Sequence, residues 1–152
     1  MAVIHNQLCG REELSPDRAC VYAVFHDAGE IITGDLPTPV KYYNPVIREN
    51  YQAIEAVAKE KLLSMLPAEL DAVYRRILFY EQEDAQYYPI VKAADKLSAY
   101  IKCAEEVKAG NREFVKAMES TLEALQASEL PEVAYFMRHY MEAYNKTLDE
   151  MN

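Results

Sequence analysis

Three ionisable side chains lie close together in the segment FHDAGEIITGDLPTPVKYY, at His26, Asp27 and Glu30. On a helix, Glu30 comes one turn after His26, so these residues could line one concave site. Imidazole and carboxylate groups are usual ligands of a catalytic divalent metal, which lowers the pKa of water and makes it a usable nucleophile. A His-Asp pair alone is a weak signal, because a packed histidine beside a capping or solvent-facing aspartate is the commoner arrangement. Two adjacent ligands are also too few, so the hypothesis of a metal site requires ligands from other helices.

Asp95 is the best further ligand candidate. It lies in VKAADKLSAY, at the margin of the apolar stripe of a predicted helix. A carboxylate in that position is costly unless it is paired or binds a metal. The alternative is an aspartate that reaches solvent or pairs with Lys92 or Lys96, and the residues alone favour that alternative.

The segment after the predicted helix forms a proline-stiffened elbow. Asp35 follows Gly34, and Thr38 stands between Pro37 and Pro39. Polar groups on a rigid loop beside a site suit the recognition of a small polar ligand. The alternative interpretation is a capped turn with no ligand.

The other two histidines are not expected to bind a metal. His139 has aromatic and methionine neighbours in FMRHYMEAY, which are typical of a packing or surface histidine. His5 lies near the start of the chain, where it could be a ligand only by accident of folding.

Helix start and stop signals predict an all-α fold of about six helices. Examples are the N-cap and first-turn residues Ser15-Pro16 and Asn44-Pro45, and the terminal Gly110. No window requires a strand. The expected helices span 16–32, 45–66, 67–80, 89–109, 112–126 and 131 to the C-terminus. The apolar start, Met1 to Ile4, has no N-cap, so it is either the end of a helix that begins upstream or a short helical turn packed on the bundle.

Length and charge limit the functional classes. A chain of 152 residues predicts one domain, and a net charge of −9 without a basic cluster excludes binding to nucleic-acid polymers, although a mononucleotide remains compatible. Three cysteines, with no C-x-x-C, predict a reduced, cytoplasmic setting, and Cys20 and Cys103 are expected to behave as small hydrophobes. Neither a signal peptide nor a membrane span is predicted.

Taken together, HDAGEIITGDLPTP and the downstream KAADKLSAYIKC resemble the HD-domain phosphohydrolases, and within them the bacterial 5'-deoxynucleotidase family. The likeness also includes NPVIRENYQAIEAVAKEKL and runs from about Ser15 to Phe114. It implies an HD-domain helical bundle and a metal-dependent phosphomonoesterase. The implied reaction converts deoxynucleoside 5'-monophosphates to deoxynucleoside and phosphate, generally in a homodimer.

The resemblance also implies roles for individual residues. Glu30 is expected to position or activate the attacking water. The expected ligands of a divalent ion such as manganese or cobalt are His26, Asp27 and Asp95. The expected substrate-binding residues are Asp27, Asp35, Leu36, Pro37, Thr38 and Asp95, with Asp35 placed to bind the sugar.

One part of the family pattern has no counterpart in this chain. The family has an upstream helix with a further histidine ligand in a Glu-His-Ser setting, preceded by an Arg-Trp pair. We therefore expect residues 1–152 to form a single HD domain that is incomplete at its N-terminus, with three protein ligands. Two alternatives follow: a catalytically silent helical dimerisation or regulatory domain, and an HD phosphohydrolase with another phosphorylated substrate.

Overall fold

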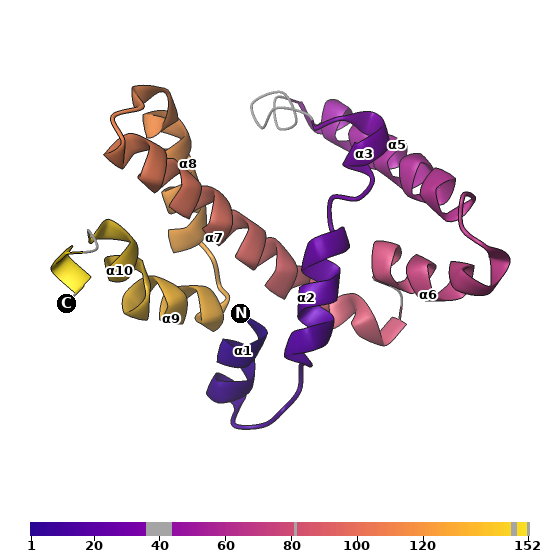
Figure 1. Cartoon of the computed structure of the whole chain (residues 1–152), viewed down its shortest axis with the longest axis horizontal. Helices are drawn as coiled ribbons and strands as arrows, with labels where there is room; N and C mark the ends of the chain where they lie inside the picture. Colours follow the sequence, from indigo (N-terminus) through magenta and orange to yellow (C-terminus); the bar gives the residue numbers. More distant parts are fainter. Residues whose placement is uncertain (36–43, 81, 147–148, 152) are drawn as a thin grey trace. The chain divides into compact units, whose positions relative to one another are not determined.

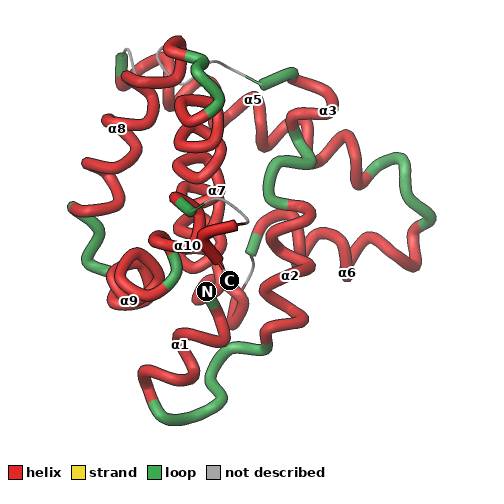
Figure 2. The backbone as a smooth tube through the Cα atoms, turned by 60° about the vertical axis from the view of Figure 1, so that its left-hand side comes forward, coloured by secondary structure: helices red, strands yellow, loops and turns green. Residues whose placement is uncertain are grey.

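The structure is a computed structural model that describes residues 1–35, 44–80, 82–146 and 149–151. Every regular element within these ranges is a helix (Figures 1 and 2). The predicted all-α class is therefore confirmed. None of the helices described is both long enough and apolar enough to cross a membrane.

The chain divides into two compact units, one formed by residues 1–19 and 87–152 and the other by residues 20–86. Helix α2 (Pro16–Phe25) begins in the first unit, and its residues from Cys20 onward belong to the second. The expectation of a single HD domain stays a prediction.

The first unit is built around the long helix α7 (Tyr87–Lys108), against which α8 (Val115–Gln126) packs (Figure 1). Its other elements are α1 (Ala2–Cys9), η2 (Arg112–Phe114), α9 (Pro131–His139), α10 (Met141–Asn145) and η3 (Asp149–Met151). The buried side chains at its centre are Ala93, Leu97, Leu125 and Val133. Helices α1 and α9, which are far apart in the sequence, also pack on each other.

Local signals explain where these helices begin and end. The Asn111 side chain accepts a hydrogen bond from the Glu113 N–H, and Pro131 occupies the first turn of α9, as predicted. Helix α7 begins at Tyr87, two residues before Pro89. The helix tolerates this proline because a proline in the first turn removes no intrahelical hydrogen bond. The predicted last helix is wrong in one respect, since it is interrupted at Tyr140 between α9 and α10.

The second unit joins the end of α2 to α3 (Glu30–Thr33), α5 (Pro45–Leu63), α6 (Ala68–Phe79) and η1 (Gln82–Gln86). The Asn44 side chain caps α5 by accepting a 2.8 Å hydrogen bond from the Val46 N–H. Tyr22 of α2 stacks on Tyr80 with ring centroids 4.7 Å apart. Tyr80 ends α6 with a φ of 52°, a left-handed conformation that a non-glycine residue rarely adopts. Aromatic packing therefore holds α2 to α6.

Candidate active site

Helix α2 ends immediately before the His-Asp pair. Residues 26–29 form turns, and α3 begins at Glu30, so the prediction of one helix from 16 to 32 is wrong here. His26 Nδ1 lies 2.7 Å from the Ala23 carbonyl oxygen. In a continuous helix that oxygen would accept the N–H of Asp27. The imidazole thus takes an acceptor that the helix would need in order to continue.

The bond to Ala23 also fixes the orientation and protonation of the His26 ring. A carbonyl oxygen can only accept, so Nδ1 carries the proton that it donates. The opposite ring nitrogen, Nε2, lies 2.9 Å from Asp27 Oδ2. Two potential ligand atoms, one on His26 and one on Asp27, therefore lie side by side. The hydrogen bond of the His26 ring to a backbone carbonyl is of a kind common among metal-binding histidines.

The spacing of these two atoms fits a shared cation. Two ligands at about 2.0–2.1 Å from a tetrahedral metal lie roughly 3.3 Å from each other. The Nε2–Oδ2 distance of 2.9 Å requires only a small outward rotation to reach that value. Asp27 is 45% exposed, whereas His26 Nε2 is shielded from solvent, so an ion would reach the pair from the side of Asp27. Without an ion, a protonated His26 would form an ion pair with Asp27 through the same two atoms.

Glu30 follows the pair through a tight turn. Its N–H donates to the Asp27 carbonyl at 2.9 Å, and its own carbonyl accepts from the Gly34 N–H at 2.9 Å. Glu30 is therefore tied to the His-Asp pair by the turn at 27–30, and not by the continuous helix that the sequence predicted.

The elbow begins at Gly34, which has φ 71° and ψ 159°. That backbone conformation is accessible to glycine and strained for other residues. The Tyr51 hydroxyl of α5 donates to the Gly34 carbonyl at 3.0 Å, and the next residue, Asp35, is exposed. Three of the predicted substrate-binding residues, Leu36, Pro37 and Thr38, lie outside the described residues.

Asp95 lies on α7 and is exposed. It belongs to the first unit, whereas His26 and Asp27 belong to the second. The predicted convergence of Asp95 on the His-Asp pair therefore stays a prediction.

The remaining histidines differ in their surroundings. His139 is exposed and its ring lies 4.4 Å from that of Tyr135, as a surface or packing histidine should. His5 is partly buried and hydrogen-bonded to two glutamates, Glu13 and Glu132. Sequence reasoning also missed Tyr51, because nothing in the sequence links it to Gly34, 17 positions earlier.

Comparisons with known proteins agree on one family. A family model described as "5'-deoxynucleotidase YfbR-like" matches residues 1–144. A 5'-deoxynucleotidase of Photobacterium profundum is 46% identical over 138 residues, which cover 91% of this chain and 71% of that protein. A 5'-deoxynucleotidase of Vibrio cholerae is 42% identical over 152 residues, which cover 100% of this chain and 78% of that protein.

A solved structure shows the same fold. The crystal structure of an HD-domain phosphohydrolase from Listeria innocua superposes with a TM-score of 0.77, covering 99% of this chain and 72% of that one. The two sequences are 24% identical, so this likeness concerns the fold.

Proposed function

The chain belongs to the 5'-deoxynucleotidase YfbR-like family, and from this premise we propose that it is a metal-dependent hydrolase of deoxynucleoside 5'-monophosphates. The family predicted from the sequence is thereby confirmed. The observation that carries the proposal is the 2.9 Å separation of His26 Nε2 and Asp27 Oδ2, within a motif followed by Glu30 and the elbow. The products would be the deoxynucleoside and inorganic phosphate.

A divalent ion would be held by His26, Asp27 and Asp95. An imidazole nitrogen with two carboxylates is a donor set suited to transition-metal ions such as manganese or cobalt. When bound, the ion would neutralise charge on the phosphate and lower the pKa of a water molecule. The proton on Nδ1 of His26, donated to Ala23, keeps Nε2 as the ligand atom.

Charge supports the need for such an ion. Asp27, Glu30 and Asp35 lie within nine residues of one another in a chain of net charge −9. Carboxylates repel a phosphate dianion, and this repulsion grows as water is excluded from a site. A site of this composition therefore needs a cation before a nucleotide phosphate can bind.

The chain's own residues would then complete the reaction. Glu30 would accept the proton of the attacking water, and Asp35 would bind the deoxyribose. Leu36, Pro37 and Thr38 would hold the nucleotide through the rest of the elbow. Most of the rate enhancement would come from positioning and electrostatic stabilisation, as phosphoryl transfer generally requires. We also propose that the protein forms a homodimer and acts in the cytoplasm.

The test measures phosphate release from deoxynucleoside 5'-monophosphates with manganese or cobalt added to chelator-treated protein. Asp27→Asn and Asp95→Asn should each reduce kcat/KM by about 100-fold or more, because each removes an anionic ligand of the proposed cation, whose charge stabilises the transition state. Asp149→Asn is the matched control, since Asp149 is exposed and lies near the C-terminus, outside the motif. Full activity in Asp27→Asn would overturn the proposed site. Turnover of only other phosphorylated compounds in a substrate panel would overturn the proposed substrate class.

A further inference from the structure

A second group of potential metal ligands lies at the N-terminal end of the first unit. His5, Cys9 and Glu13 each offer one ligand atom, and these atoms all lie within 4.8 Å of one another. His5 and Cys9 are one turn apart on α1, and Glu13 lies in the segment that follows Gly10. Imidazole, thiolate and carboxylate are the three ligand types that zinc accepts in proteins.

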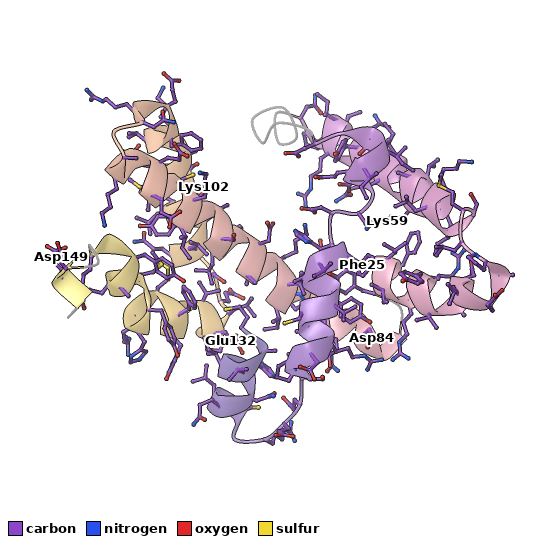
Figure 3. The ribbon with its side chains drawn as sticks, in the orientation of Figure 1. Phe25, Lys59, Asp84, Lys102, Glu132 and Asp149 are labelled. Atoms are coloured by element: carbon purple, nitrogen blue, oxygen red, sulfur yellow. The ribbon has the colours of Figure 1, made fainter. Side chains whose placement is uncertain are left out.

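Glu132 of α9 orients the histidine of this group. Figure 3 labels this glutamate. Its Oε1 lies 2.7 Å from His5 Nδ1, and the residue is only 3% exposed. Its second oxygen, Oε2, has no hydrogen-bond partner among the described residues. A buried carboxylate that accepts a hydrogen bond from Nδ1–H leaves Nε2 as the ligand atom. Metal-bound histidines commonly have such a partner on the other ring nitrogen.

The segment after α1 is folded back toward the helix by Asn6. Its Oδ1 accepts from the N–H groups of Glu13 and Leu14, each at 3.0 Å, and its Nδ2 donates to the Leu14 carbonyl at 2.7 Å. These three bonds hold Glu13 beside the helix. The group is therefore organised by the fold before any ion binds, which lowers the cost of binding.

The distances suit a tetrahedral ion. His5 Nε2 and Glu13 Oε2 are 3.1 Å apart, against roughly 3.3 Å for two such ligands on zinc. A thiolate and an imidazole nitrogen on the same ion are roughly 3.6 Å apart, which lies within the span of this group. Arg11 pairs with the other oxygen of Glu13, Oε1, and so leaves Oε2 directed at His5.

We propose that His5, Cys9 and Glu13 form a second divalent-metal site, selective for a thiolate-binding ion such as zinc, in which Glu132 orients His5. Three protein ligands leave one position for water. The alternative is a purely electrostatic role, with a protonated His5 bridging Glu13 and Glu132 and the Cys9 thiol donating to the Arg11 carbonyl at 3.2 Å; only the metal site requires Cys9 as a thiolate. The site is independent of the proposed hydrolase site, since it uses none of the same residues.

Cobalt replaces zinc in such sites and reports a bound thiolate through a thiolate-to-cobalt charge-transfer absorption band. The metal-free, reduced full chain titrated with cobalt should develop this band, and zinc should abolish it by competition. Cys9→Ser should eliminate the band. The matched control is Cys20→Ser, because Cys20 is exposed on α2 and lies outside the group.

Two further variants test Glu13 as a ligand and Glu132 as the residue that orients His5. Glu13→Gln, at an exposed position, and Glu132→Gln should each weaken zinc binding by about 10- to 100-fold, as loss of a ligand or of its orienting partner does. If Glu132→Gln fails to fold by circular dichroism, Glu13→Gln alone decides the point. Asp27→Asn should keep the thiolate band even where it abolishes hydrolysis, so the two proposals can fail separately.

The outcomes are decisive in both directions. No charge-transfer band in the parent protein, or equal loss of the band in Cys9→Ser and Cys20→Ser, would overturn the second site.

A complementary measurement is alkylation by iodoacetamide followed by peptide mass analysis. Zinc should protect Cys9 and leave Cys20 reactive.

Discussion

The Tyr51 hydroxyl donates to the Gly34 carbonyl at 3.0 Å and so joins α5 to the residue that precedes Asp35. Tyr51 is only 8% exposed, so its ring is fixed by packing while its hydroxyl reaches the backbone. Gly34 has a φ of 71°, which few other residues tolerate. The start of the elbow is therefore held from two sides, by its own backbone conformation and by α5.

Removing this hydroxyl should loosen the elbow without disturbing the core. Tyr51→Phe keeps the buried ring and deletes one hydrogen bond, whose loss costs about 0.5–1.5 kcal/mol. If the elbow binds the nucleotide as proposed, KM should rise by about 3- to 10-fold while kcat changes little. Steady-state kinetics on a deoxynucleoside monophosphate measure this split, with Tyr144→Phe as an exposed control. An unchanged KM in Tyr51→Phe would show that the bond does not position the elbow for substrate.

An ion pair between a buried carboxylate and a partly exposed arginine should contribute strongly to the stability of the second unit. The Asp84 carboxylate is fully buried, and Arg76 of α6 donates to it through Nε. Arg76→Met leaves the carboxylate in the interior without this partner, which should reduce the free energy of unfolding by about 3 kcal/mol. Chemical denaturation followed by circular dichroism measures the change.

The neighbouring arginine provides the control. Arg75 pairs with Glu60 and Asp71, both of which are about half exposed, whereas Asp84 is fully buried, so Arg75→Met should cost much less than Arg76→Met. Equal losses in the two variants would mean that the burial of Asp84 does not determine the effect.

The three cysteines should differ in reactivity. Burial raises the pKa of the Cys103 thiol above its ordinary value, whereas Cys9 and Cys20 are exposed. Because the thiolate is the reactive form, Cys103 should resist iodoacetamide at pH 8 in the folded, metal-free protein. Peptide mass analysis should find Cys9 and Cys20 modified first and Cys103 modified only after unfolding. Modification of Cys103 as fast as Cys20 would contradict the burial of that thiol. The exposure of Cys20 already differs from its expected role as a small hydrophobe.

Local signals predicted most helix starts, because capping is a property of a few adjacent residues. Pro16, Pro45 and Pro131 each begin a helix as predicted, and Asn111 caps the turn at the start of the next segment. The break after Phe25 was missed because it depends on a side chain. His26 competes for the Ala23 carbonyl, and no propensity or periodicity signals that competition.

The N-terminal group of potential ligands, His5, Cys9 and Glu13, was missed for a different reason. His5 and Glu132 are 127 positions apart, and only the packing of α1 on α9 brings them together. The i, i+4 spacing of His5 and Cys9 was visible in the sequence and could have suggested a shared face. The His-Asp pair, by contrast, was recognisable because its two potential ligand atoms come from adjacent residues.

The end of α7 should carry a pH-dependent part of the stability. Glu106 accepts from Lys102 Nζ at 2.5 Å and from the Asn111 side-chain amide at 2.9 Å. These hydrogen bonds lower the pKa of Glu106 below its ordinary value of 4.5, and the bond from Lys102 has the larger effect. A carboxyl group with a lowered folded pKa stabilises the fold above its unfolded pKa. That stabilisation is lost as the pH falls through the lower, folded pKa.

Lys102→Met should therefore raise the pKa of Glu106 toward 4.5, although Asn111 still contributes its hydrogen bond. A pH titration of the Glu106 side-chain carboxyl by NMR measures the shift, with Lys116→Met on α8 as an exposed control. Glu106→Gln should lower the free energy of unfolding at pH 7 and have a smaller effect at pH 3, where the carboxyl of the parent protein is increasingly protonated. The explanation fails if the loss in Glu106→Gln is the same at both pH values, because the stabilisation would then come from the shape of the side chain and not from its charge.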